Sequence, residues 1–109
     1  MPHIRLRGMT AEQVQRLSEN LADELAPILE TTRDNFTIEL VQTQFFEGGQ
    51  PHGGYPFCEV LWFERSAAHR QRCAEWLTNT IRQITKATDI AVVFSPIEKT
   101  NYFENGKHF

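Results

Sequence analysis

The order of the predicted secondary structure constrains this chain most, because strand, helix and strand occur twice with matching elements offset by roughly 53 to 56 positions. The first set lies in residues 1–47 and the second in 57–94, and a hairpin-like tail follows over 95–109. Each set is expected to hold two parallel strands joined by a right-handed crossover. The sequence therefore predicts one α+β domain over 1–109, in which two βαβ units form a four-stranded mixed sheet with both helices on one face.

Two amphipathic stripes predict the helices. Thr10 and Gln13 form a capping box that opens the first helix, which is expected to run to about Glu30. Its apolar positions recur every three or four residues at Val14, Leu17, Leu21, Leu25 and Ile28. Ser66 caps the second helix. The apolar stripe of this second helix comprises Cys73, Trp76, Leu77, Ile81 and Ile84.

Residues 57–63 form a predicted strand that is apolar on both faces apart from Glu59. A strand of this kind has to be covered on both sides. Because both helices lie on one face, nothing within the chain covers the other, and a partner subunit is expected there. Glu59 is expected either to pair at that subunit interface or to turn into a pocket.

The remaining segments are predicted from alternation and turn residues. Residues 36–45 alternate with a change of buried parity near 40 and 41, which predicts one long strand with a β-bulge. The stretch after it holds four glycines and a proline, which predicts a flexible loop. A glycine-rich phosphate cradle is the weaker alternative, because no strand–loop–helix context follows. Residues 90–94 predict the fourth strand, and Asn105-Gly106 predicts a tight turn in the tail.

Composition and charge exclude several classes of protein. Eleven Lys and Arg against 14 Asp and Glu give a net charge of -3, which does not favour binding to nucleic acid or to an anionic membrane. No apolar run is long enough for a membrane span or a signal peptide, so we expect a cytoplasmic protein. The spacing of Cys58 and Cys73 and the scattered histidines indicate core thiols rather than a metal site, and no cofactor is expected.

Pro2 is the candidate catalytic residue. If Met1 is removed, the Pro2 nitrogen becomes a secondary amine at the head of a predicted strand in which Ile4 and Leu6 are buried. An α-amino group titrates near ~8 in water, and burial or a nearby cation lowers that pKa, so the amine could act as a base at neutral pH. The alternative is that Pro2 only favours an extended start to the chain.

Four segments in this order resemble the tautomerase superfamily: Pro2-His3, the loop and strand GGQPHGGYPFCEVLWF, Arg65-Ser66 with Arg70-Gln71, and the tail TNYFENGKHF. The likeness spans nearly the whole chain. It is nearest to 5-carboxymethyl-2-hydroxymuconate isomerase and to tautomerase-like proteins without a defined substrate, and more distant from macrophage migration inhibitory factor. Members begin with a processed proline and form trimers whose sheets face inward, so the resemblance implies a homotrimer.

The resemblance also implies roles for individual residues. Pro2 would move the proton, and Arg65 corresponds to a substrate-binding arginine of the isomerase that would hold a carboxylate at two points. Arg33 lies where superfamily members carry a lysine or arginine, while the isomerase's other arginine has no counterpart here. For Arg65 the alternative is a solvated loop arginine.

Four further residues are candidates for the wall of the pocket: His3, Trp62, Phe63 and Phe103. Aromatic residues on strands also serve as core, and a histidine at this position also serves as a structural hydrogen-bonding residue.

Two functions are therefore expected. The first is a tautomerase or isomerase of small enol or keto carboxylates with Pro2 as general base. The alternative is a non-enzymatic oligomeric binding protein that kept the fold and lost the activity.

Overall fold

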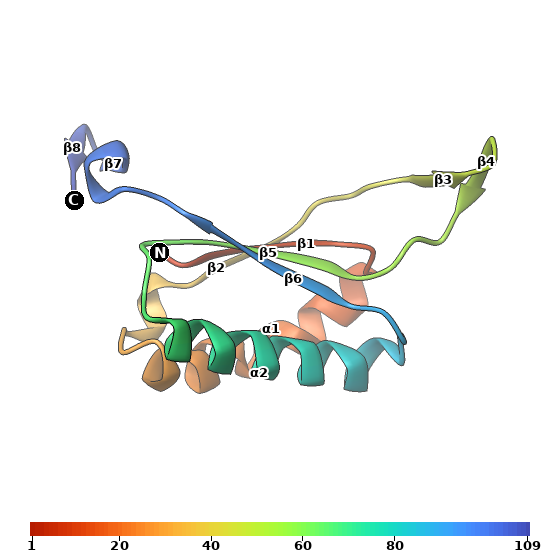
Figure 1. Ribbon diagram of the computed structural model, residues 1–109, viewed down its shortest axis with the longest axis horizontal. Helices are drawn as coiled ribbons and strands as arrows, with labels where there is room; N and C mark the ends of the chain where they lie inside the picture. Colours follow the sequence, from red (N-terminus) through yellow and green to blue (C-terminus); the bar gives the residue numbers. More distant parts are fainter.

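The computed structural model describes residues 1–109 and has two layers, with two helices covering one face of a four-stranded sheet (Figure 1). The helices and the strands of this sheet are β1 (His3–Arg7), α1 (Ala11–Ile28), β2 (Thr37–Leu40), β5 (Phe57–Trp62), α2 (Ala67–Thr85) and β6 (Ala91–Pro96). The short elements are η1 (Arg33–Asn35), β3 (Phe45–Glu47), β4 (Gln50–His52), η2 (Lys99–Asn101), β7 (Phe103–Glu104) and β8 (Lys107–His108).

The strand order of the main sheet is β2-β1-β5-β6. β1 is parallel to β2, β5 is parallel to β6, and the two units meet through the antiparallel pair β1–β5. The predicted α+β fold, with a mixed sheet and both helices on one face, is confirmed. β1 and β5 occupy the centre of the sheet, so the start of the chain is held between two neighbouring strands.

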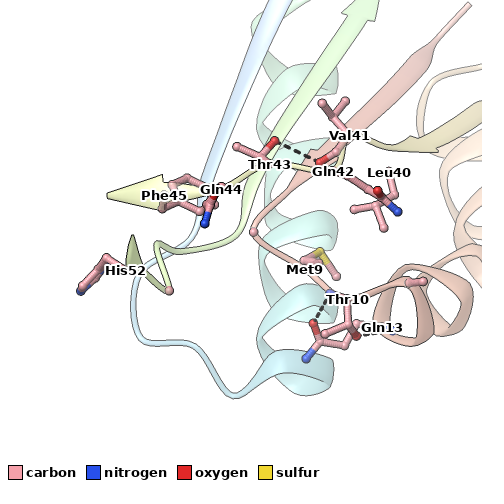
Figure 2. Close-up of a pocket in the computed structure, with 13 residues that line it drawn as sticks. Met9, Thr10, Gln13, Leu40, Val41, Gln42, Thr43, Gln44, Phe45 and His52 are labelled. Atoms are coloured by element: carbon pink, nitrogen blue, oxygen red, sulfur yellow. Dashed lines mark hydrogen bonds between the residues drawn. The ribbon is translucent and has the colours of Figure 1, made fainter. Parts of the chain in front are cut away.

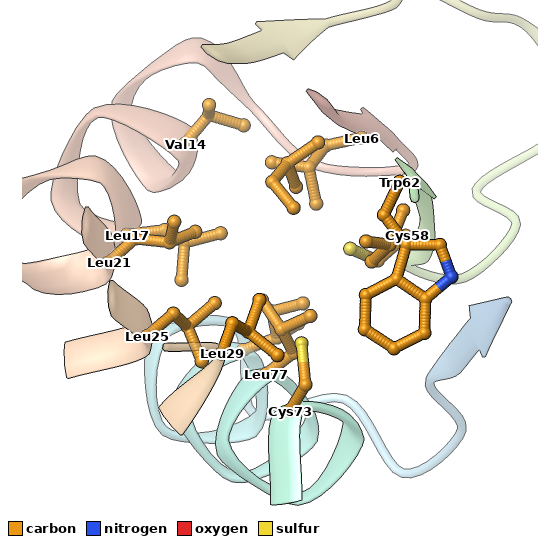
Figure 3. Close-up of a cluster of buried hydrophobic side chains, with 13 residues drawn as sticks. Leu6, Val14, Leu17, Leu21, Leu25, Leu29, Cys58, Trp62, Cys73 and Leu77 are labelled. Atoms are coloured by element: carbon orange, nitrogen blue, oxygen red, sulfur yellow. The ribbon is translucent and has the colours of Figure 1, made fainter. Parts of the chain in front are cut away.

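The hydrophobic core fills the space between the sheet and the helices (Figure 3). From the sheet it takes alternate residues of the two central strands, namely Ile4, Leu6, Cys58, Val60 and Trp62. From the helices it takes Val14, Leu17, Leu21, Leu25, Cys73, Leu77 and Ile81, followed by Leu29 just after α1. Both cysteines are free and buried, and burial raises the pKa of each thiol to about 12.

Both helices begin at the predicted caps. The Thr10 hydroxyl accepts from the backbone of Gln13, whose side chain accepts from the backbone of Thr10. The Ser66 hydroxyl accepts a hydrogen bond from the backbone N–H of His69, at the first turn of α2. No helix combines the length and the apolar character that crossing a membrane requires.

The glycine-rich stretch is a β-hairpin, so the prediction of a flexible loop is wrong. The prediction of one long strand over 36–45 is also wrong. β2 ends at Leu40, and β3 pairs with β4 instead of extending the main sheet. Gly48 and Gly49 both have positive φ, +57° and +79°, as a two-residue hairpin turn of this kind requires. That turn folds Phe45–Glu47 back onto Gln50–His52.

The tail forms a second hairpin, β7–β8, around the predicted Asn105-Gly106 turn. Figure 1 shows the two hairpins beyond opposite ends of the sheet, on the side away from the helices. The exposed large apolar side chains lie on these extensions or on the open face of the sheet: Phe46, Tyr55, Val93, Phe103 and Phe109.

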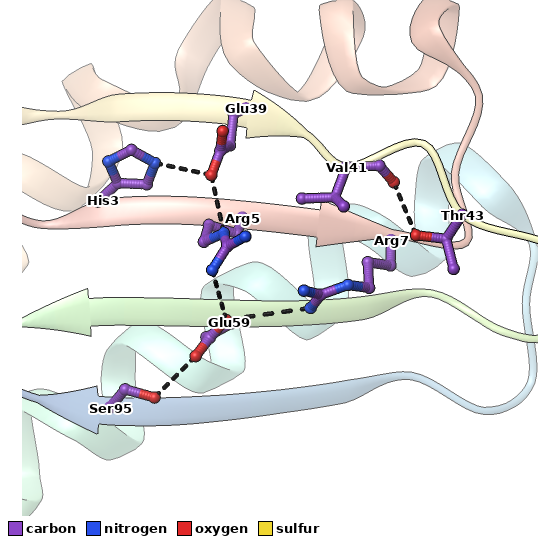
Figure 4. A network of polar contacts seen from close by, with 8 residues as sticks. All are labelled: His3, Arg5, Arg7, Glu39, Val41, Thr43, Glu59 and Ser95. Atoms are coloured by element: carbon purple, nitrogen blue, oxygen red, sulfur yellow. Dashed lines mark hydrogen bonds and ion pairs between the residues drawn. The ribbon is translucent and has the colours of Figure 1, made fainter.

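The open face carries a polar network that crosses all four strands (Figure 4). Glu39 contacts His3 at 3.0 Å and Arg5 at 2.8 Å, and Arg5 lies 3.7 Å from Glu59. Glu59 also accepts a hydrogen bond from Ser95 at 2.9 Å. The hydrogen bond with His3, supported by the charges of His3 and Arg5, holds the pKa of Glu39 below its ordinary value. Glu59 is thus paired within its own chain and lines neither of the two cavities described below.

Gly8 joins β1 to α1 at a position that tolerates no side chain. Its φ is +75°, and an added Cβ would overlap the carbonyl group of Tyr55. We therefore expect Gly8→Ala to lower the free energy of unfolding by about 3 kcal/mol, from backbone strain plus this clash. Gly49→Ala is the matched control, because Gly49 has φ +79° and open space around it, and should lose only about 1 kcal/mol. Equal losses in urea denaturation would show that contact with Tyr55 does not fix this turn.

Candidate functional site

A cavity of about 330 Å³ lies at the end of the sheet where the chain begins. Three parts of the chain form it: the start, the connection between α1 and β2, and the end of β5 together with the tail. The lining residues are Met1, Thr31, Asp34, Asn35, Thr37, Phe63, Arg65, Lys99, Tyr102, Glu104 and Phe109. This volume is at the lower end of the range for small-molecule sites.

The pairing of β1 places the start of the chain in this cavity. Thr37 donates its backbone N–H to the Pro2 carbonyl at 3.2 Å, which extends the β1–β2 ladder to residue 2. Pro2 itself is fully buried, while Met1 lines the cavity. The terminal amine is therefore held at a defined place beside the sheet.

Arg65 lies in the turn between β5 and α2 and is fixed by two carbonyl groups. Its Nε donates to the Leu29 carbonyl at 3.0 Å, and its Nη1 donates to the Phe63 carbonyl at 2.8 Å. Its Cζ lies 5.4 Å from the ring centroid of Trp62, which supports the guanidinium by a cation–π contact. The rest of the planar donor set remains available for a carboxylate.

The terminal amine and Arg65 interact electrostatically. Burial lowers the pKa of the Met1 amine, the charge of Arg65 lowers it further, and Glu104 acts in the opposite direction. Burial also lowers the pKa of Arg65, but a guanidinium stays charged at neutral pH. A cation that can bind an anion thus lies near an amine that loses its proton more readily than an ordinary terminus.

An aromatic cluster closes one side of the cavity. The ring centroid of Phe63 lies 5.4 Å from that of Tyr102 and 5.5 Å from that of Phe109, and those of Tyr102 and Phe109 are 5.0 Å apart. The backbone N–H of Phe109 donates to the Tyr102 carbonyl at 3.1 Å. The tail is thereby held against β5 and supplies an apolar wall.

The structure brings some of the predicted site residues together and separates others. Phe63 and Arg65 line the cavity, and Pro2 adjoins it through Met1. Arg33 is exposed and pairs with Asp23 at 3.1 Å, outside the cavity lining.

The other three assigned wall residues lie elsewhere. His3 belongs to the network on the open face, and Trp62 is 1 % exposed in the core. Phe103 is 61 % exposed and packs against His108 within the tail hairpin.

Lys99, Tyr102 and Phe109 were not predicted as site residues. The aromatic residues of the tail were visible in the sequence, but nothing in their spacing indicated that the tail folds back onto Phe63. The sequence does not indicate that Lys99 lies at the cavity, because the position of this residue depends on η2. That short helix follows the hydrogen bond from the Ile97 N–H to the Trp62 carbonyl at 2.7 Å.

A second, larger cavity of about 500 Å³ lies between the start of α1 and residues 40–45 (Figure 2). Its lining holds no Lys, Arg, Asp or Glu. The ring of His52 accepts a hydrogen bond from the Gly54 N–H and lies 3.1 Å from a carboxylate oxygen of Glu47. The cavity has no lysine or arginine that could bind a carboxylate. No group of three or more His, Cys, Asp or Glu residues is placed to hold a metal ion.

Comparison with known proteins identifies close relatives. A family model described as "Domain of unknown function (DUF1904)" matches residues 1–108. A DUF1904 structure from Sebaldella termitidis is 42 % identical, with a TM-score of 0.96 and full coverage of both chains. A protein of unknown function from Vibrio cholerae is 41 % identical with a TM-score of 0.88, and the match covers 99 % of this chain and 87 % of that one. A search of curated proteins returns no match.

The fold is also found in more distant structures. A protein described as a fused 4-OT asymmetric trimer has a TM-score of 0.84 at 17 % identity, with 98 % of this chain and 95 % of that one covered. This similarity confirms the fold that the tautomerase resemblance implies. The chain therefore belongs to the DUF1904 family and has the tautomerase fold.

Proposed function

We propose that the protein is a tautomerase or isomerase of small enol or keto carboxylates, with the amine of Pro2 as general base after removal of Met1. The observation that carries this proposal is that the start of the chain and the Arg65 guanidinium line one small cavity. A base, a carboxylate anchor and an apolar wall are what such a proton transfer needs. Arg33 is not included in the proposed site.

In the full chain Met1 acylates Pro2, so the Pro2 nitrogen is an amide without basicity. Removal of Met1 turns this nitrogen into a secondary amine at a position that is more deeply buried than Met1. The causes that lower the pKa of the Met1 amine, burial first and Arg65 second, would then act on Pro2.

The proposed reaction begins when the substrate carboxylate binds Arg65, with its carbon chain against the ring of Phe63. The unprotonated amine takes the hydroxyl proton of the enol, and the ammonium ion formed returns a proton to carbon. The product is the keto acid, and the amine is regenerated. No oxidant, reductant or cofactor is consumed.

We further propose that the chain forms a homotrimer through its open sheet face. Nothing within the chain covers this face, and the exposed apolar residues Phe46 and Val93 lie on it or on the hairpins beyond it. The cavity, whose lining is largely exposed, would then lie at a subunit boundary. If the chain has no activity, the alternative is an oligomeric binding protein that retains the same cavity.

The activity is tested with protein whose loss of Met1 has been verified by mass spectrometry. We expect ketonisation of enol-phenylpyruvate or of a 2-hydroxymuconate-type diacid, followed by ultraviolet absorbance. Pro2→Ala should lower kcat by a factor of about 10² to 10⁴, because the base changes from a secondary to a primary amine with different position and basicity. Arg65→Met should chiefly raise KM, because the carboxylate loses its cation.

Pro27→Ala is the control for a proline change and should leave kcat unchanged, because Pro27 is exposed in the last turn of α1 and does not line the cavity. If processed wild-type protein matches the buffer blank across a panel of enol acids, the tautomerase proposal is wrong.

The assembly is tested by light scattering, which should give three times the chain mass of 12.6 kDa. Val93→Lys should shift the protein toward monomer, because it places a charge on the apolar part of the open face. Asn79→Lys adds the same charge on the exposed side of α2 and should leave the trimer intact. A wild-type monomer would contradict the proposed assembly.

A further inference from the structure

A serine, a histidine and a glutamate are in contact at the start of α2, and none of them lines the cavity at the chain start. The Ser66 Oγ lies 2.6 Å from Nδ1 of His69, and Nε2 of the same ring lies 3.4 Å from a carboxylate oxygen of Glu30. Ser66 caps α2 and His69 lies in its first turn, while Glu30 follows α1. The imidazole ring is therefore held between a hydroxyl and a carboxylate from two separate parts of the chain.

Only one of the four histidines has this pair of contacts. His3 and His52 also lie beside a carboxylate, at 3.0 and 3.1 Å, but neither ring contacts a hydroxyl. The ring of His108 makes its hydrogen bond to a backbone carbonyl. His69 is thus the histidine that joins an acid to a hydroxyl oxygen, which is a possible nucleophile.

Both contacts of His69 are favourable when the ring proton is on Nε2. A carboxylate beside Nε2 favours this tautomer, because it accepts from an N–H and repels a bare nitrogen. Nδ1 is then an acceptor, and the Ser66 hydroxyl donates its proton to it. Nucleophile, base and acid have this relation in serine hydrolases, there with the roles of the two ring nitrogens exchanged.

The position of Ser66 suits attack on a carbonyl carbon. The side chain is exposed, so a substrate reaches its oxygen from solvent. The backbone N–H of His69 donates to this oxygen at 3.2 Å and fixes it. Ala67 and Ala68 follow directly, and the N–H groups at the start of a helix have no acceptor within it. Such donors stabilise the negative oxygen that forms when a hydroxyl adds to a carbonyl group.

We propose that Ser66 is the nucleophile of a second activity, the hydrolysis of small activated carboxylic esters. His69 is its general base, and Glu30 is a positioning residue that acts through the ring of His69. The acyl group is small because a site open to solvent offers little surface to a long chain. This inference is independent of the tautomerase proposal, since it uses neither Pro2 nor Arg65.

The reaction has two steps that balance without a cofactor. The Ser66 oxygen bonds to the ester carbonyl carbon while its proton passes to Nδ1 of His69. The bond from this carbon to the alcohol oxygen breaks, and the alcohol leaves with the proton from His69. Water then attacks the acyl-serine in the same way, which releases the carboxylic acid and restores the Ser66 hydroxyl.

The test uses 4-nitrophenyl acetate with the full chain and follows the release of 4-nitrophenolate by absorbance. Release should continue beyond one equivalent per chain, because acylation of surface amines stops after each amine has reacted once. Mass spectrometry of peptides from protein quenched in acid should place an acetyl group on Ser66. His69→Gln should slow the release by a factor of about 10², the lower end of the contribution of a general base.

Three further variants separate chemistry from folding. Ser66→Asn keeps a good helix cap but has no hydroxyl, so it should abolish turnover while the protein stays folded by circular dichroism. Glu30→Asp, which keeps the carboxylate, should retain more of the rate than Glu30→Gln, whose amide also permits the other tautomer of His69. Ser18→Ala is the matched control, because Ser18 is exposed and donates to the Gln15 carbonyl instead of to a histidine. Its rate should equal that of wild type.

The inference is overturned if release stops at or below one equivalent, if the acetyl group is found only on amines, or if His69→Gln reacts as fast as wild type. Turnover that survives in Ser66→Asn would also overturn it.

Discussion

The candidate site depends on the pairing of β1 with strands on both sides. A chain terminus ordinarily has freedom to move, but here hydrogen bonds to β2 and β5 fix residues 3–7, and the Thr37 N–H extends the pairing to Pro2. Burial of Ile4 and Leu6 in the core holds the same strand from below. Arg65 is fixed independently by the carbonyls of Leu29 and Phe63. The relation between amine and guanidinium is thus a property of the folded core and not of a flexible end.

The open face of the sheet carries both charged and apolar side chains. The sequence of residues 57–63 predicts a strand that is apolar on both faces apart from Glu59, and hence a covering subunit. On the open face, Phe57 and Leu61 are half-buried, and Glu59 between them takes part in the network with Arg5. A partner placed on this face would meet a charged band with apolar margins. Ion pairs already formed within each chain would lower the cost of covering these charges.

The main elements were predictable because they follow from local rules. Capping residues at Thr10 and Ser66 and apolar stripes at helical spacing marked both helices, and period-two alternation marked the central strands. The β3–β4 hairpin is not predicted, because a glycine-rich stretch is also typical of a flexible loop. In the structure, Gly48 and Gly49 have positive φ at two consecutive positions and form a hairpin turn. Arg65 was predicted from the resemblance to the isomerase and from its place after a strand, and Phe63 was predicted as an aromatic residue of the wall. Lys99 and Phe109 were not predicted as site residues, because their positions depend on long-range packing of the tail.

The central claim is that this fold lets the terminal amine lose its proton at a lower pH than an ordinary terminus does, so that the free amine is available as a base at neutral pH. It is tested most directly by following the ¹⁵N resonance of Pro2 against pH in protein that has lost Met1. The account predicts a pKa below the ordinary value of a terminal amine, and a higher pKa in Arg65→Met because one of the two causes is removed. A Pro2 amine that titrates at its ordinary pKa in both proteins would contradict the account.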